Sequence, residues 1–480
     1  MPLNEPQNQL WRIEGILTAR SPLHVGDGRK AEQNADHNDA EISTFCRDVH
    51  NRPYIPGSSL RGFLREAFRR RYPSTEESLF GFQDLRSSAA NAAARGGLLS
   101  VWDAPSTGAA IVKTAHHVVI DRQTRTADDG LLFFEEFLPA GTTFSINLVI
   151  ECAKQHPDED VAQLVRQLLG LLKDLHNDPG RLGSNTASGY GHVGWSMVKV
   201  SKLTPKALQS WLASDKQLID CLEKDNSIAA DPFIYKITDR YLPIKVVLNF
   251  TGPFLVNNPD AAKKKGAGPQ HDDSKANHVA MQTPDKRCRL PGSSLHGALR
   301  SQTERIARTI AGTDENARNW VRNVGKPTAA TENYRAVDCL WGGVGLRSPI
   351  RVSDFEAKQA ETMSRQEFVA IDRFTGGGAD SLKFNADGFV RPVLHGELLI
   401  DLNALKALKD NAPIPPHVRP DAADWAQVLL LLAFCIRDWM EGDIHLGFGA
   451  SKGYGHCTAH LPDYPTAKHL FNKLTQCLNQ

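Results

Sequence analysis

Two polar loops of this 480-residue chain carry carboxylates whose type and position suit acid–base or metal chemistry. The first loop holds Asp36, Asp39 and Glu41, and the second holds Asp272 and Asp273. A carboxylate in a loop beside a phosphate-binding element can hold Mg²⁺ or assist a proton transfer. Acids are common in surface loops, so an ordinary solvated loop is the alternative interpretation of each of them.

A Pro-Gly-Ser-Ser tetrapeptide follows each loop and predicts the start of a helix. After the first copy, apolar residues from Leu60 to Phe68 fall at helical spacing, with Ser58 or Ser59 as the expected N-cap. The glycine permits a close backbone approach, and a helix start offers unpaired N–H groups and a positive dipole end. We therefore expect a phosphate site there, and a capped helix with a solvated basic face is the alternative. The residues expected to bind are Gly57, Ser58, Ser59, Arg61 and Arg65, then Gly292, Ser293, Ser294, His296 and Arg300.

A glycine-rich loop occurs late in each half of the chain. Its backbone amides are little obstructed by side chains, which suits contact with a polyanion. The loop lacks the Gly-Lys-Ser/Thr ending of a P-loop and does not follow a strand as a dinucleotide-binding motif does. Tight packing against a sheet is the alternative interpretation. The expected contacts are Gly189, Tyr190 and Gly191 in the first loop, and Gly453, Tyr454 and Gly455 in the second.

A hairpin is predicted in the middle of each half. The segment from His116 to Arg122 and the segment from Phe368 to Arg373 read as a strand that leads into a polar turn. An apolar return strand follows each turn. Such a hairpin is either a surface decoration or a wedge between stacked bases, and Arg122 and Arg373 at the turns are expected to contact RNA in the second case.

These signatures recur in the same order, which indicates a tandem duplication. The offset of 251 residues that separates Asp103 from Asp354 also separates Asp121 from Asp372. Each copy is too long for a solenoid repeat and needs its own core. We therefore predict domains at residues 1–230 and 236–480, with residues 225–231 as the linker and a helix over residues 203–222.

Mixed strand and helix patterns predict the fold class. In the second copy, Ile244, Val246 and Leu248 alternate with polar or less apolar residues, as in a half-buried strand. Late helices are expected at residues 161–175 and 425–439. Because the elements do not follow a regular βαβ alternation, they favour an α+β, ferredoxin-like core with insertions.

Composition limits the functions that remain. With 41% hydrophobic residues and a net charge of +1, the chain has no global basic field, so any polyanion site is local. Eight cysteines without a CxxC pair argue against a zinc ribbon and, without a signal peptide, indicate a reducing, cytoplasmic setting. The longest strongly apolar run, residues 428–436, is far shorter than a membrane span.

Together these motifs resemble the RAMP superfamily, and specifically the backbone subunits of type III CRISPR effector complexes. The fused pair looks like the double backbone subunit of type III-D-like systems. The resemblance covers nearly the whole chain. It rests on Leu23-His24-Val25-Gly26-Asp27-Gly28, Pro53 through Gly62, Leu79-Phe80-Gly81, Ile120-Asp121-Arg122 and the first Gly-Tyr-Gly loop, and on Leu290 through Gly297, Leu340-Trp341-Gly342, Ile371 through Gly376 and the second loop.

The resemblance implies two RRM-like domains, each with a thumb hairpin, at residues 116–134 and 369–384. It also implies stacking along a CRISPR guide RNA within a complex of several subunits, and Mg²⁺-dependent cleavage of target RNA by a loop aspartate. In the family, the catalytic aspartate usually lies a few residues before an apolar pair that leads to a second acid. When the alignment is counted strictly from Asp48, Ile42 stands where the catalytic aspartate is expected, so Asp39 or Glu41 would substitute for it. In the second copy Asp273 is nearest. Asp39 and Asp273 are thus the expected metal ligands, with Asp36 and Asp272 in reserve.

Three functions remain open at this point. The first is a guide-binding backbone subunit that cuts target RNA with its loop acids. The second is a purely structural guide-binding module without cleavage. The third is a CRISPR RNA-processing endoribonuclease, which is disfavoured because the Pro-Gly-Ser-Ser helix and the tandem thumbs resemble stacking subunits.

Overall fold

The structure, a computed structural model, describes residues 8–32, 41–83, 94–108, 110–120, 127–153, 160–233, 236, 240–258, 261–262, 276–283, 285–311, 336–343, 346–410 and 425–479. The chain divides into two compact units. Unit 1 comprises Met1–Thr186 and Tyr190–Ile237, and unit 2 comprises Ala187–Gly189 and Thr238–Gln480. Each unit has a hydrophobic core of its own.

Unit 1 is built on a five-stranded antiparallel sheet with strand order β13-β12-β1-β11-β7. In its central strand, Ile13 and Leu17 are buried whereas Arg12 and Glu14 are partly exposed, because successive side chains point to opposite faces. The strands are β1 (Asn8–Ala19), β7 (Leu99–Val101), β11 (Thr143–Ala153), β12 (Val193–Lys202) and β13 (Glu223–Lys224).

Helices and a second sheet complete unit 1. Buried residues of α1 (Gly57–Arg71) and α3 (Val161–Lys173) share one core with β1 and β11, and α2 (Glu76–Phe80) follows α1. The second sheet has the order β2-β3-β10-β9. Its strands are β2 (Gly26–Glu32), β3 (Glu41–Phe45), β9 (Lys113–Ile120) and β10 (Ala127–Phe137), and the short pairs are β4 (Tyr54–Ile55) with β8 (Ala104–Pro105) and β5 (Phe82–Gln83) with β6 (Ala94–Arg95).

The segment that ends the first copy differs from its prediction. The helix expected over residues 203–222 is confirmed only as α4 (Pro205–Leu212), which Thr204 caps by accepting from the Ala207 amide. Polar residues follow Ala213, and the chain then forms only a 3-10 turn at Leu218–Asp220. The predicted linker packs on unit 1, since the Asp231 amide donates to the Arg166 carbonyl in α3 at 2.9 Å.

Unit 2 repeats the plan of unit 1. Its strand β14 (Tyr241–Phe250) pairs with β22 (Val393–Asp401) on one side and β23 (Cys457–His460) on the other, as β1 pairs with β11 and β12. The predicted alternation of β14 is confirmed. The sheet also holds β17 (Arg289–Leu290), β18 (Ile350–Val352) and β19 (Phe355–Ala357). The helices are α5 (Gly292–Ala311), α7 (Ala336–Trp341), α8 (Leu402–Lys409), α9 (Trp425–Glu441) and α10 (Ala467–Asn479).

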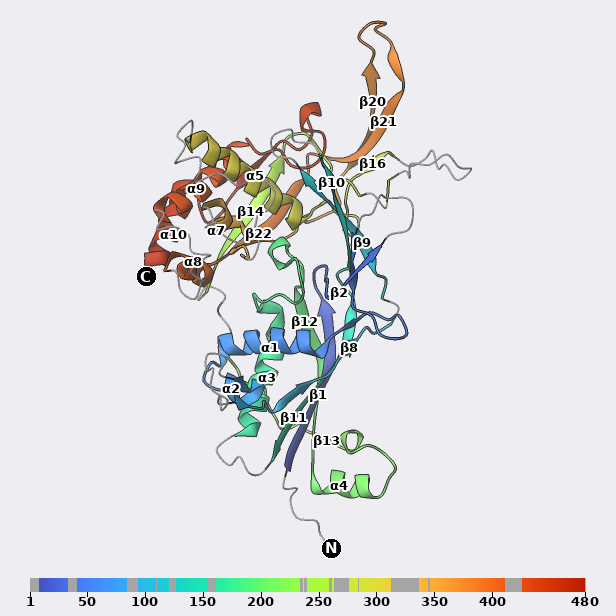
Figure 1. Ribbon diagram of the computed structural model, residues 1–480, viewed down its shortest axis with the longest axis vertical. Coiled ribbons are helices and arrows are strands. Elements are labelled where there is room, and N and C mark those ends of the chain that lie inside the picture. Colours follow the sequence, from blue (N-terminus) through green and yellow to red (C-terminus); the bar gives the residue numbers. More distant parts are fainter. Residues whose placement is uncertain are drawn as a thin grey trace. The chain divides into compact units, whose positions relative to one another are not determined.

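Both predicted hairpins pair as antiparallel strands. In unit 1, β9 pairs with β10, and in unit 2, β20 (Met363–Ile371) pairs with β21 (Gly378–Val390). The β20–β21 hairpin extends away from the helices of its unit (Figure 1), and β15 (Pro253–Phe254) and β16 (His278–Val279) flank its base. The α+β fold class is therefore confirmed, as are the late helices α3 and α9.

Candidate functional site

Each Pro-Gly-Ser-Ser helix begins at its glycine, with a carboxylate of the same unit at its start. The Gly57 amide donates to Asp103 Oδ1 at 2.7 Å, and the Gly292 amide donates to Asp354 Oδ1 at 2.8 Å. The serine N-cap predicted for α1 is wrong, because Pro56 holds that position and the anion comes from a distant aspartate. The repeated aspartate was a signal for this contact in the sequence.

The two helix-start glycines are required by close packing. A Cβ atom on Gly57 would lie 2.4 Å from the Val101 carbonyl oxygen, and one on Gly292 would lie 2.5 Å from the Val352 carbonyl oxygen. The residues after them are more accessible, because Ser58 and Ser294 are exposed while Ser59 and Ser293 are half-buried. Each helix start therefore exposes one serine within its first turn, at the second residue of α1 and at the third residue of α5.

In unit 1, the predicted basic pair holds the end of the following short helix. Arg61 Nη2 donates to the Phe80 carbonyl at 2.7 Å, and its guanidinium lies 5.6 Å from the centre of the Phe80 ring. Arg65 donates to the Gly81 carbonyl at 2.9 Å and pairs with Glu76. Burial, and then the charge of Arg65, lower the pKa of Arg61. These contacts give both arginines a structural role, and their contact with RNA stays a prediction.

The equivalent pair in unit 2, His296 and Arg300, likewise contacts the short helix that follows, α7. Arg300 donates to Asp338 Oδ1 at 2.8 Å and to the Gly342 carbonyl at 2.5 Å, just after α7. His296 lies edge-on to the Trp341 ring, with 5.2 Å between the ring centres. Burial, and then the charge of Arg300, lower the pKa of His296 to about 4, so its imidazole is neutral at pH 7. The repeated Leu-Phe-Gly and Leu-Trp-Gly motifs are thus explained as the partners of these basic side chains.

The glycine loops close tightly on the segment after the first strand of each copy. The Gly191 amide donates to the Pro22 carbonyl at 2.8 Å, and the Gly455 amide donates to the Pro253 carbonyl at 2.8 Å. A Cβ atom would lie 2.0 Å from the Leu182 carbonyl oxygen at Gly191 and 1.9 Å from the Leu446 carbonyl oxygen at Gly455. For these two glycines, the contacts agree with the packing interpretation.

The tyrosines of the glycine loops are buried, and Gly453 of the second loop is open. Tyr190 and Tyr454 belong to the cores of their units, and the Tyr454 hydroxyl donates to Gln366 Oε1 at 2.6 Å. Burial raises the pKa of Tyr454. Gly453 is exposed with nothing within 4 Å of a Cβ atom, whereas Gly189 is half-buried and a Cβ atom on it would lie 3.0 Å from the Val352 carbonyl oxygen. The RNA contacts expected of these loops stay predictions.

The tip of the second hairpin presents an aromatic side chain. Asp372 Oδ1 accepts from the amides of Phe374 and Thr375, both at 2.8 Å. These backbone bonds lower the pKa of Asp372. The turn leaves Phe374 100% exposed, and Arg373 beside it is exposed as well. Arg122, expected at the first tip, lies outside the described residues.

The predicted acidic loops also fall largely outside the described residues. Asp36, Asp39, Asp272 and Asp273 all lie there. Glu41 begins β3, where its backbone pairs with Glu32 of β2. The catalytic and metal-binding roles of these five acids therefore stay predictions.

A buried polar cluster at the base of the first hairpin was not predicted. Glu135 accepts from Asn185 Nδ2 at 2.5 Å, and its two oxygens lie 3.7 Å from His24 Nε2 and 3.8 Å from His117 Nε2. Burial lowers the pKa of His117, although Glu135 opposes that shift. The second copy lacks the cluster, since Leu255 and Ala386 stand in place of His24 and Glu135, and only the Leu-His-Val-Gly motif hinted at it.

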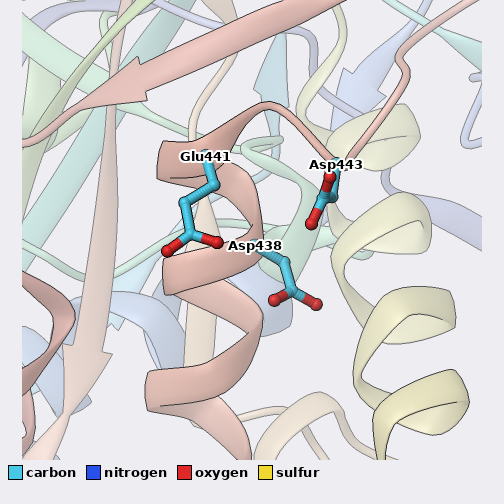
Figure 2. Close-up of side chains that lie close together, drawn as sticks. All are labelled: Asp438, Glu441 and Asp443. Carbon is cyan, nitrogen blue, oxygen red and sulfur yellow. The ribbon is translucent and has the colours of Figure 1, made fainter.

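One acidic cluster in unit 2 lies away from these sites. Asp438 and Glu441 at the end of α9 and Asp443 just after it lie close together (Figure 2), and one carboxylate oxygen of each lies within 4.8 Å of the others. Gln302 donates to Asp438 at 2.6 Å, and Arg437 lies 3.3 Å from Asp438 and 3.8 Å from Glu441. Two of the three carboxylates, those of Asp438 and Glu441, thus already have partners within the unit, and we assign no metal to the cluster.

A known protein family matches both halves of the internal repeat. The family model described as the RAMP superfamily matches residues 16–193 and 266–458, which together exceed half of the chain. Each matched region includes one Pro-Gly-Ser-Ser helix, one hairpin and one glycine loop. A search of curated proteins finds no match. Among the described residues, no helix is both long and apolar enough to cross a membrane.

Proposed function

Because the chain belongs to the RAMP superfamily, we propose that it is a guide-RNA-binding backbone subunit of a type III CRISPR effector complex. Superfamily membership suggests a CRISPR-associated role in RNA binding. In the proposal, each unit is an RRM-like domain whose hairpin is a thumb, and the partners are the guide RNA, the target RNA and other effector subunits. The duplicated helix starts and the two hairpins support it.

A glycine on each exposed helix face is the observation that carries the proposal. Gly62 in α1 and Gly297 in α5 occupy equivalent positions and are exposed, and a Cβ atom on either would meet nothing within 4 Å. Glycine inside a helix costs about 0.5–1 kcal/mol relative to alanine. Two glycines kept where alanine would stabilise the helix indicate that something outside the unit approaches the backbone there. The sugar-phosphate backbone of RNA fits this role. Ser58 and Ser294, which lie about one helical turn before these glycines, can donate hydrogen bonds to phosphate oxygens.

The Gly62→Ala and Gly297→Ala changes should stabilise the protein and weaken guide binding. Each should raise the free energy of unfolding by about 0.5–1 kcal/mol. Each should also raise the Kd for guide RNA roughly tenfold. This is the effect of losing one hydrogen bond to a charged group, which contributes about 1.5 kcal/mol. Urea denaturation and filter binding measure the two effects. The control is Ser210→Ala on the exposed side of α4, and guide affinity equal to that of this control would leave the helix face without an RNA role.

We further propose that the loop acids support cleavage of target RNA. The 2′-hydroxyl of RNA can serve as the nucleophile, so the protein needs only to align it with the scissile phosphate. Mg²⁺ held by Asp39 and Asp273 would stabilise the charge that develops on the phosphate. The structural alternative has an observation in its favour, because Ile42, which stands where the family's aspartate aligns, lies in β3 opposite Phe134.

Labelled target RNA incubated with the assembled complex, with Mg²⁺ or with EDTA, tests cleavage. Asp39→Ala should remove one product and Asp273→Ala a different one, while RNA affinity stays roughly constant. Phe374→Ala should weaken the cut made by unit 2, because an exposed apolar side chain can wedge between base steps. Survival of both products in the double aspartate variant would mean that the loop acids do not make the cuts, and would favour a structural guide-binding role for this chain.

A further inference from the structure

A pair of stacked rings lies across the strands of each hairpin. His117 of β9 is opposite Phe133 of β10, and Phe368 of β20 is opposite Phe384 of β21. The ring centres are 4.9 Å apart in both pairs, and the ring planes are inclined by 16° and 17°. The two units therefore present the same aromatic arrangement at the same place on the hairpins seen in Figure 1.

The pairs are retained although their surroundings have changed. His117 and Phe133 correspond to Phe368 and Phe384 by an offset of 251 residues, the same offset that relates Asp103 to Asp354. One step closer to the hairpin base on the same face, Ala115 and Glu135 of unit 1 are replaced by Gln366 and Ala386 in unit 2. In unit 2, Phe368 also packs against the core and Phe384 lies edge-on to His278, so the contacts around the pair differ between the units while the two stacked rings are kept in both.

The rings are accessible, and in unit 2 a cation lies beside them. Phe133 is 47% exposed, and Phe384 is half-buried. The exposed Lys452 places its Nζ atom 5.8 Å from the centre of the Phe384 ring and 5.6 Å from that of Phe448. Aromatic faces beside a positive charge are the arrangement on which bases of single-stranded nucleic acid stack, because every base has a π-face and a nearby phosphate.

We propose that each of these stacked pairs is a binding site for one unpaired nucleobase of bound RNA, with Phe133 and Phe384 as the stacking faces and Lys452 as the phosphate partner in unit 2. This inference rests on the proposed RNA-binding function and adds the residues and the kind of contact. The competing role is stabilisation of the hairpin by a cross-strand pair, which needs no ligand.

The test uses the full chain with guide RNA that carries 2-aminopurine at each position in turn. Stacking on an aromatic ring quenches this base, so one quenched position is expected for each unit. Phe384→Leu keeps an apolar side chain but removes the ring, and should restore fluorescence at one position and raise the Kd about five- to hundredfold. Phe384→Tyr keeps the ring and should preserve the quenching. Phe133→Leu and Phe133→Tyr should do the same at the other position.

The outcomes separate this inference from the function on which it rests. Guide RNA that binds as tightly to the leucine variants, with an unchanged pattern of quenching, would overturn the stacking site and leave RNA binding intact. No guide binding by the unaltered chain would overturn both. Lower thermal stability of the leucine and tyrosine variants alike, with quenching retained in both, would assign the pair to hairpin stability instead.

Discussion

Replacing Asp178 by alanine should unfold unit 1 at urea concentrations at which unit 2 remains folded. The Asp178 side chain is 1% exposed and lies between Arg70 Nη2, at 2.5 Å, and Arg71, whose side chain is 0% exposed. Its removal leaves buried guanidinium charge without its main partner. Breaking a buried pair in this way costs about 3–5 kcal/mol, a large part of the roughly 5–15 kcal/mol that stabilises a domain.

Urea denaturation followed with probes in each unit measures this effect, and also tests the prediction that the two copies fold as separate domains. The matched control is Lys206→Ala, which breaks an ion pair with Glu223 whose lysine side chain is 83% exposed and should cost less than about 1 kcal/mol. Equal losses in the two variants, or a single transition that shifts as a whole, would contradict the prediction.

Acid should reproduce part of this loss. Burial raises the pKa of Asp178, but Arg70, Arg71 and the Gly180 amide outweigh burial and hold the pKa below its ordinary value. A carboxyl group with a depressed pKa stabilises the fold above its unfolded-state pKa of about 3.9. That contribution is lost as pH falls through the folded pKa. The contribution should be missing from Asp178→Asn, whose stability would change less below about pH 4.

Replacing Gly455 by alanine should destabilise unit 2 by about 3 kcal/mol or more, the combined effect of left-handed backbone strain and a backbone clash. Gly455 has a φ of +75°, and its Cβ atom would lie 1.9 Å from the Leu446 carbonyl oxygen. Gly453 offers a control in the same loop, because its φ is +80° but nothing lies within 4 Å. Gly453→Ala should therefore cost only the strain, about 1–2 kcal/mol.

The urea transition of unit 2 compares these two variants directly. Gly191→Ala should repeat the larger effect in unit 1, since its Cβ atom would lie 2.0 Å from the Leu182 carbonyl oxygen. A loss at Gly453 as large as that at Gly455 would mean that backbone conformation, and not the close approach of two backbone segments, makes these loops glycine-rich.

Features set by neighbouring residues were predictable from the sequence. The alternation in β14, the helical spacing in α3 and α9 and the two hairpins follow from local periodicity, and the structure confirms them. Local pattern failed after α4, where the polar residues from Ser214 onward end the helix. Periodicity alone does not show where a helix stops when its apolar face has little to pack against.

Contacts between distant residues could not be predicted in the same way. The cap of α1 joins residues 46 positions apart, and the Glu135 cluster joins Asn185 to a strand 50 positions away. The duplication partly compensates, because a residue kept in both copies, such as Asp103 with Asp354, points to a shared contact without identifying it. Where the copies differ, as at His24 and Leu255, even that signal is missing.

The internal caps of the two helix starts affect how salt should act on RNA binding. Asp103 and Asp354 already offset the positive ends of α1 and α5, and Arg65 and Arg300 are paired with acids of their own units. Groups neutralised inside the protein release few counterions from RNA, whereas exposed cations release about one each. The slope of log K against log salt would therefore count side chains such as Lys452 and Arg373, and would be shallower than the number of basic residues in the motifs suggests.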